Sequence, residues 1–375
     1  MRPATATAAA VTTLIGVGAA AVAAGRYASD AALKAPPGRP LPTDPELTVH
    51  STAPGRIALT RCLAALRPGV YGIEGSGIHA VVGEVVDHAR HPADTVVRRL
   101  ERVTRGSPEP GDRVRMTPQI HRGTPAEALG LDHQDVEIPS ELGVLPAWLV
   151  EGARNTWVIA VHGLGTTREH TLNTMAFLHR HKLPVLALAY RGDEGAPRSP
   201  DGLAHLGDSE WRDLDAAIRY AVRSGAERVI LHGWSTGATM ALRAATDSAL
   251  RDRVRGVVLD SPVLDWEGTV RALAVANGAP SALLPLAVRA AQGRTGPHGD
   301  HLREAADPRV LRVPALVFHG PDDTLASWQR TRELAARRPE LVTLHTVQHA
   351  PHAAMWNADP ARYEEALRRF LTPLM

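Results

Sequence analysis

Apolar runs alternate with amphipathic segments over the C-terminal two thirds of the chain. Trp157–Val161 and Pro184–Tyr190 are almost wholly apolar, as expected of strands buried on both faces. Between such runs, Ser209–Ser224 repeats apolar residues at helical spacing, with Trp211 and Leu214 on one face. Strands that alternate with helices predict a mostly parallel, doubly wound sheet covered on both faces. We expect this α/β domain to span residues 134–375.

The same pattern predicts further elements of this domain. A final helix should begin at Pro360, with Asp359 as its N-cap and Tyr363, Leu367 and Phe370 facing the core. The remaining strands are expected as an entry hairpin followed by four buried runs: Asp135–Ile138 and Ala147–Val150, then Val229–Leu231, Arg255–Asp260, Pro314–His319 and Leu341–Thr346.

Residues 47–133 have a different pattern and predict a small N-terminal β-rich accessory domain. Short strands broken by Gly and Pro are expected here, with Val96–Val103 as a further strand or a short helix: Leu47–His50, Val70–Ile73, His79–Val86 and Arg113–Met116. No catalytic constellation is visible. His88 and His91 lack the third and fourth ligands of a zinc site, so we predict no metal here.

The N-terminus carries a candidate targeting segment. Residues 3–25 are uncharged and rich in Ala and Gly, which predicts a signal anchor or a cleavable signal peptide within residues 1–26. An Ala-rich soluble helix is the alternative. We therefore expect a membrane location through a single-pass N-terminal anchor, or export if the segment is cleaved. Positive-inside counting leaves its orientation open. Residues 27–46 contain five prolines, Pro36, Pro37, Pro40, Pro42 and Pro45, and predict a semi-rigid linker.

Composition narrows the classes of partner. The net charge of +2 and the absence of a basic stripe argue against a nucleic-acid partner. No phosphate-binding loop, H-E-x-x-H motif or dinucleotide-binding fingerprint is present, so no cofactor is expected. One cysteine, Cys62, excludes an intramolecular disulfide.

The clearest chemical signal is Gly233-Trp234-Ser235-Thr236-Gly237. It follows a buried strand and precedes a helix-forming stretch, which is the arrangement of a nucleophile elbow. The tight turn lifts the serine hydroxyl above the sheet, and the helix N-terminus supplies backbone N–H groups where an oxyanion would form. Ser235 is therefore the candidate nucleophile.

A serine needs a base, and the base needs an orienting carboxylate. Asp322 and Asp323 follow one predicted strand, and His349 and His352 follow the next, in the order nucleophile, acid, histidine. The spacing alone does not choose within either pair, and Asp260 is an alternative acid one strand earlier. The oxyanion hole is expected from the backbone N–H groups of Thr236 and Leu164, the latter in His162-Gly163-Leu164-Gly165. We interpret these glycines as allowing the backbone to approach a substrate oxygen.

Residues 134–374 resemble the serine hydrolases of the α/β-hydrolase superfamily. The resemblance rests on VHGLG, HGWSTGA, VVLDSPVLDW, FHGPDD and HAPH. The arrangement of the chain is similar to that of actinobacterial members with an N-terminal membrane segment and to that of the serine aminopeptidase and acylaminoacyl-peptidase-like branch. The resemblance implies Asp323 as the acid and His352 as the base. Thr236 and Ala238 depart from the residues common in that family, which affects the shape of the pocket.

We therefore expect an α/β-hydrolase fold and a serine hydrolase that cleaves an ester or amide bond through an acyl-enzyme on Ser235, Asp323 and His352. A cap is expected over about residues 266–310, and the partner is a small-molecule or peptide acyl substrate. Acyl transfer or peptide cleavage by the same triad is one alternative. A catalytically silent, membrane-anchored binding protein is the other.

Overall fold

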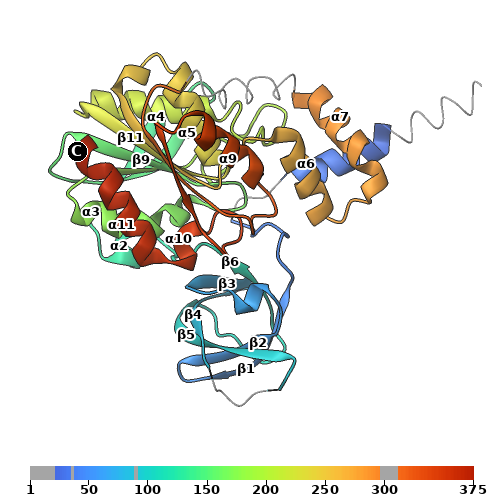
Figure 1. Cartoon of the computed structure of the whole chain (residues 1–375). Helices are drawn as coiled ribbons and strands as arrows, with labels where there is room; N and C mark the ends of the chain where they lie inside the picture. Colours follow the sequence, from blue (N-terminus) through green and yellow to red (C-terminus); the bar gives the residue numbers. More distant parts are fainter. Residues whose placement is uncertain (1–21, 35–37, 88–91, 296–310) are drawn as a thin grey trace, which may run out of the picture.

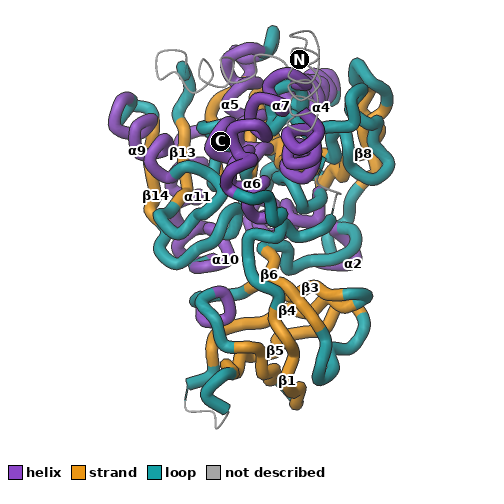
Figure 2. Tube along the Cα trace, turned by 90° about the vertical axis from the view of Figure 1, so that its right-hand side faces the viewer, coloured by secondary structure: helices purple, strands orange, loops and turns teal. Residues whose placement is uncertain are grey.

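The computed structural model describes residues 22–34, 38–87, 92–295 and 311–375. The described chain forms two sheets, a closed six-stranded barrel and an eight-stranded sheet. Figures 1 and 2 place the barrel at one end of the larger α/β domain, with β3 and β6 at the junction. The expected division into a β-rich part and an α/β part is thus visible in the arrangement of the strands.

The barrel closes because β1 pairs with both β2 and β6, so no strand is left with a free edge. Its strand order is β1-β2-β5-β4-β3-β6. Residues 96–103, which the sequence left open, lie in a long strand. The short strand β2 was not predicted. The strands are β1 (Leu47–Ala53), β2 (Arg56–Thr60), β3 (Tyr71–Gly75), β4 (Ile78–Val85), β5 (Thr95–Arg105) and β6 (Arg113–Thr117), with a 3-10 turn at η1 (Ala64–Leu66).

A buried arginine holds the loop between β2 and β3. Arg98 on β5 is fully buried, and its guanidinium donates to four backbone carbonyl oxygens: Gly83 at 2.8 Å, Ala65 at 3.0 Å, Arg67 at 2.7 Å and Gly69 at 2.8 Å. These carbonyl dipoles replace water around the charge. The segment that leads into Tyr71 on β3 is thereby fixed.

The main sheet is mixed. Its order is β14-β13-β12-β11-β9-β10-β8-β7, and the strands from β9 to β14 run parallel, whereas β7 and β8 form the expected antiparallel entry hairpin. All the predicted strands of this domain are present: β7 (Gln134–Pro139), β8 (Val144–Val150), β9 (Thr156–Val161), β10 (Val185–Leu188), β11 (Arg228–Trp234), β12 (Val254–Asp260), β13 (Ala315–His319) and β14 (Val342–Thr346).

Helices cover both faces of this sheet, as the alternating pattern predicts. Apolar residues of α4, α5 and α9 form one core with the sheet, and those of α3, α10 and α11 form the other. Asp359 caps α11 by accepting from the Arg362 N–H at 3.0 Å, and Pro360 is its first residue, as expected. The helices are α2 (Pro125–Leu129), α3 (Leu172–Arg180), α4 (Trp211–Arg223), α5 (Thr236–Asp247), α9 (Trp328–Arg337), α10 (Met355–Ala358) and α11 (Pro360–Leu371), with 3-10 turns η2 (Arg168–Thr171), η3 (Arg251–Arg253) and η5 (Thr372–Leu374).

The described part of the expected cap contains α6 (Trp266–Ala276), η4 (Ser281–Leu283) and α7 (Leu284–Thr295). A helix over residues 22–33 packs against α6 and α7 and buries Ala28, Ala32 and Leu33 in a shared apolar cluster. Residues 27–33 therefore do not belong to a free linker, contrary to the prediction for residues 27–46. Their small side chains allow close contact with the cap.

The predicted membrane segment, residues 3–25, lies mostly outside the described residues. None of the helices in the described ranges has the length and apolar character needed to cross a membrane. The anchor therefore stays a prediction. His88 and His91 also lie outside the described residues.

Polar contacts dock the barrel and the segment that follows it onto the α/β domain, among them those of Asn357 and Glu169. The side-chain amide of Asn357 on α10 donates to the backbone carbonyl oxygens of Val70 and Pro118 at 2.9 Å each. The backbone carbonyl of Asn357 accepts from the Val70 N–H. Glu169 on η2 accepts from Gln119 at 2.5 Å and from the Gly123 N–H at 2.7 Å. Because α10 and η2 adjoin the loops described below, the barrel is fixed relative to both.

We predict that Arg98→Met lowers the free energy of unfolding by about 3 kcal/mol, because four buried carbonyl groups lose their donor. Urea unfolding followed by circular dichroism measures the effect. Arg99→Met is the matched control, since the Arg99 side chain is 62% exposed and its removal should cost less than about 0.5 kcal/mol. Equal losses in the two variants would contradict this role of Arg98.

Candidate active site

The candidate residues meet at the carboxyl edge of the parallel strands. Ser235 follows β11, Asp323 follows β13, and His352 follows β14. Because parallel strands end at one edge of the sheet, residues far apart in sequence come together there. This edge faces the cap and the barrel.

The turn at Ser235 is strained and tightly packed. Its φ of 54° and ψ of −119° are values that non-glycine residues rarely adopt. A Cβ on Gly233 would lie 2.2 Å from the Gly237 oxygen, and one on Gly237 would lie 2.3 Å from the Val161 oxygen. Only glycine therefore fits at these two positions. The Ser235 N–H donates to the Asp260 carbonyl oxygen at 2.8 Å, which fastens the turn to β12.

Ser235, His352 and Asp323 form one continuous line of hydrogen bonds. The Ser235 Oγ lies 2.6 Å from His352 Nε2, and His352 Nδ1 lies 2.8 Å from Asp323 Oδ2. An ionised carboxylate only accepts, so Nδ1 carries the proton and Nε2 is the acceptor for the serine hydroxyl. This tautomer is the one that a general base requires.

Asp323 is held by four donors. His352 Nδ1 and His319 Nε2, the latter at 3.0 Å, reach Oδ2, while the backbone N–H groups of Leu325 and Ala326 reach Oδ1 at 2.9 Å each. Burial alone would raise the pKa of Asp323, but the electrostatic interaction with His352 and the hydrogen bonds from His319 and His352 outweigh it and hold the pKa below its usual value. The carboxylate is therefore charged at neutral pH.

Asp322 and His349, the other members of the two candidate pairs, contact each other. Asp322 Oδ2 accepts from the His349 backbone N–H at 2.8 Å. His349 is exposed, and its φ of 60° turns the loop so that His352 can reach inward. Asp322 and His349 thus join the acid and histidine loops without entering the line of hydrogen bonds.

Asp260, the alternative acid, is fully buried but makes no contact with His352 in the described structure. Its Oδ1 accepts from the Ser261 hydroxyl at 2.9 Å. Burial raises its pKa to about 8, an effect that the nearby charge of Asp323 increases. Asp260 therefore holds a proton at neutral pH and cannot supply a negative charge to a histidine.

Of the two expected oxyanion donors, Thr236 directly follows Ser235, and Leu164 directly follows Gly163, which packs against Ser235. Thr236 is the first residue of α5, so its N–H has no acceptor within the helix. The Gly163 carbonyl accepts from the Thr166 hydroxyl at 3.0 Å, which turns the adjoining Leu164 N–H to the opposite side of the peptide plane. His162 steadies this loop through Asp193 at 2.7 Å.

The glycines of this loop are needed for packing inside the protein. A Cβ on Gly163 would lie 2.6 Å from the Ser235 Cβ, and one on Gly165 would lie 2.8 Å from the Leu41 Cγ. Our interpretation that both make room for a substrate oxygen is therefore incomplete. Gly165 makes room for the N-terminal segment.

Three contributors to the site are not predicted from the sequence. The sequence pattern places His319 only at the end of a strand and His162 only in a glycine loop. A histidine that ends a buried strand beside a candidate acid is a signal that could have found His319. Leu41, in the proline-rich stretch, carried no such signal, because its contact depends on the folded chain.

Comparisons with known proteins agree with this architecture. A family model described as "Alpha/beta hydrolase family" matches residues 158–372, and one described as "Domain of unknown function (DUF8805)" matches residues 48–117. No curated protein matches the chain.

Among solved structures, an esterase from Pyrococcus furiosus is 22% identical, with a TM-score of 0.55 over 67% of this chain and 96% of the esterase. Another crystal form of that esterase gives 22% identity and a TM-score of 0.56, over 68% and 95% of the two chains. This likeness shows a shared fold.

The raised pKa of Asp260 predicts a pH-dependent contribution to stability. The folded state keeps a proton that the unfolded chain releases above pH 3.8, so this contribution is complete below that pH and is lost as the pH rises to about 8. Asp260→Asn has no such titration. The unfolding free energy of wild type should therefore fall, relative to Asp260→Asn, by about 1.4 kcal/mol per pH unit across this window. Urea unfolding between about pH 5 and 8 measures it. A difference that stays constant with pH would contradict the burial of a protonated Asp260.

Proposed function

Because the chain belongs to the alpha/beta hydrolase family, whose model matches more than half of its 375 residues, we propose that it is a serine hydrolase that cleaves an ester bond through an acyl-enzyme. Two hydrogen bonds carry this assignment: Ser235 Oγ to His352 Nε2 at 2.6 Å and His352 Nδ1 to Asp323 Oδ2 at 2.8 Å. They join a nucleophile, a base and an orienting carboxylate in one line.

In the proposed reaction, Ser235 Oγ attacks the substrate carbonyl carbon while His352 Nε2 takes the hydroxyl proton. Asp323 keeps the imidazole in place and stabilises the positive charge that it gains. The backbone N–H groups of Leu164 and Thr236 bind the oxyanion. His352 then protonates the leaving oxygen, which departs as an alcohol. Water, activated by the same histidine, releases the acid and restores Ser235.

The choice of an ester rests on the esterases that share the fold, and on the chemistry of the triad, which cleaves esters more readily than amides. Peptide cleavage and acyl transfer use the same residues. A silent binding protein would have no need for a charged Asp323 aligned with His352 and Ser235. The buried donors around Asp323 therefore favour an active enzyme.

A fluorophosphonate probe should label Ser235 covalently in the wild type and leave Ser235→Ala unlabelled. His352→Ala and Asp323→Asn should lower the labelling rate by about 10³-fold or more, because the serine loses its base or the correct tautomer. Mass spectrometry of the labelled peptide identifies the site.

Asp322→Asn and His349→Gln are the matched controls, since each alters the neighbour of a triad residue. Their labelling rates should stay within about threefold of wild type. Absence of labelling in a folded wild type would overturn the proposed function, and a loss in either control equal to that of Asp323→Asn would overturn the assignment within the pairs.

His319 should act as a positioning residue for Asp323. Its Nδ1 lies 2.7 Å from the Thr331 hydroxyl, which leaves Nε2–H to donate to the carboxylate. His319→Leu should lower kcat for an ester by about 10- to 100-fold with little change in KM, because a charge-assisted hydrogen bond is lost.

His319→Gln retains an amide donor and should recover most of the activity. Steady-state hydrolysis of N-acetyltyrosine methyl ester by both variants measures the difference. Equal losses of activity and of stability in the two variants would indicate a packing role alone.

A further inference from the structure

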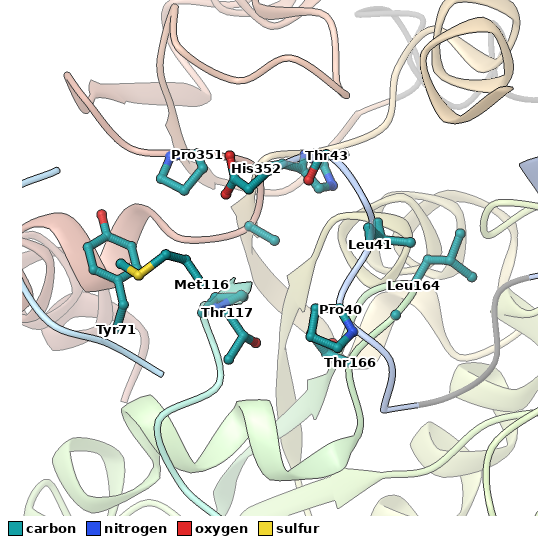
Figure 3. Close-up of a pocket in the computed structure, with 14 residues that line it drawn as sticks. Pro40, Leu41, Thr43, Tyr71, Met116, Thr117, Leu164, Thr166, Pro351 and His352 are labelled. Atoms are coloured by element: carbon teal, nitrogen blue, oxygen red, sulfur yellow. The ribbon is translucent and has the colours of Figure 1, made fainter. Parts of the chain in front are cut away.

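The segment over residues 38–46, here called the strap, lies directly on the loop that carries Leu164. A Cβ on Gly165 would lie 2.8 Å from the Leu41 Cγ and 3.0 Å from the Arg39 oxygen, and one on Gly38 would lie 3.3 Å from the Thr167 Cγ2. Figure 3 shows Pro40 and Leu41 of the strap beside Leu164 and Thr166. The strap is therefore part of the wall around the site.

Both ends of the strap are fixed. On one side, the helix over residues 22–33 is fastened to the cap by the bonds of Arg294 to Ser29, at 3.1 Å, and to Asp30. On the other side, Asp44 accepts two hydrogen bonds from Arg67, at 2.6 and 2.7 Å, and its carbonyl accepts from Arg115 at 2.6 Å. Because Arg67 and Arg115 belong to the barrel part of the chain, the strap joins the cap to the barrel across the site.

The strap and the barrel line an open cavity of about 50 Å³ beside His352. The barrel contributes Tyr71 and Met116 on one side of the cavity, and the strap contributes Pro40 and Leu41, beside Leu164, on the other. Met116 and Tyr71 are buried, so the wall that they form is rigid. A dry cavity that binds benzene has a volume of roughly 150 Å³, so this space admits only a small group.

A second, larger space lies on the Thr236 side of the same loop. This cleft has a volume of about 690 Å³ and is lined by Thr236, Leu164 and charged side chains of both signs, among them Lys34, Asp193 and Arg198. Thr236 is an expected oxyanion donor, whereas the small cavity is lined by His352 and not by Thr236. The Leu164 loop lines both spaces, with His352 in the wall of the small cavity and Thr236 in the wall of the large cleft.

Proton delivery decides which half of the substrate enters which space. His352 Nε2 must come within hydrogen-bond reach of the leaving oxygen, so the leaving group lies beside His352. The acyl group then extends past Thr236 into the larger cleft. Building on the proposed function, we propose that the strap and the barrel form the leaving-group pocket and restrict the substrates to esters of a small alcohol with a large polar acid.

Within this arrangement, Leu41 sets the size of the leaving group. The test uses N-acetyltyrosine methyl, ethyl and butyl esters, whose alcohols differ in size and little in reactivity. Wild type should prefer the methyl ester. Leu41→Ala should raise kcat/KM for the butyl ester relative to the methyl ester by about tenfold, because the wall recedes. Leu41→Phe should lower the ethyl-to-methyl ratio.

Leu63→Ala is the matched control, because Leu63 lies near the barrel strands, is 86% exposed and does not line the cavity. Fluorophosphonate labelling of every variant reports separately on Ser235 and on folding.

Labelling of all variants together with a shifted ester ratio in Leu41→Ala alone would support the pocket. Equal rates for the three esters in wild type, an unchanged ratio in Leu41→Ala, or a labelled enzyme that cleaves none of the esters would overturn it and leave the proposed function intact. A folded wild type that is not labelled would overturn both.

Discussion

The close approach of three backbone segments around Ser235 is the constraint on which the rest of the site depends. The elbow, the end of β9 and the Leu164 loop pack without side chains between them at Gly163, Gly233 and Gly237. This packing holds Ser235 at a positive φ that an isolated turn would not keep. The strained conformation directs the Ser235 hydroxyl toward His352. It also leaves the first N–H groups of α5 without an acceptor within the helix.

The two buried carboxyl groups near this turn are in different protonation states. Four donors keep Asp323 ionised beside His352, whereas Asp260, with fewer partners, keeps its proton. Two adjacent negative charges in a buried region would repel each other, so the different hydrogen bonding of the two groups gives each a separate state. The same strand edge thus holds one charged and one neutral acid.

Much of this could be predicted from the sequence, because local signals were strong where chemistry is concentrated. The glycines of the elbow and the apolar strands are local patterns, and the chain order gives the two candidate pairs, Asp322 or Asp323 and His349 or His352. The choice within each pair came from the family resemblance. The short strand at Arg56–Thr60 has only three apolar residues, Ile57–Leu59, which is too short a run to indicate a strand. Barrel closure depends on pairing between strands that are distant in the sequence. The sequence does not predict that the helix over residues 22–33 joins the cap, because its partners α6 and α7 lie far from it in the sequence. Long-range contacts of this kind leave no periodicity.

The docking of Asn357 against Val70 joins residues separated by 287 positions, and Asp30 and Arg294 are separated by 264. Contacts of such long range form late in folding, because the intervening chain must first be in place. The surface of the barrel that contacts Asn357 therefore stays uncovered until α10 has been synthesised. During synthesis, Ser235 is already present while His352 and the Asn357 contact are still to be added. The site is complete only once His352 has left the ribosome, so a chain that has reached Ser235 but not His352 contains the nucleophile without its base.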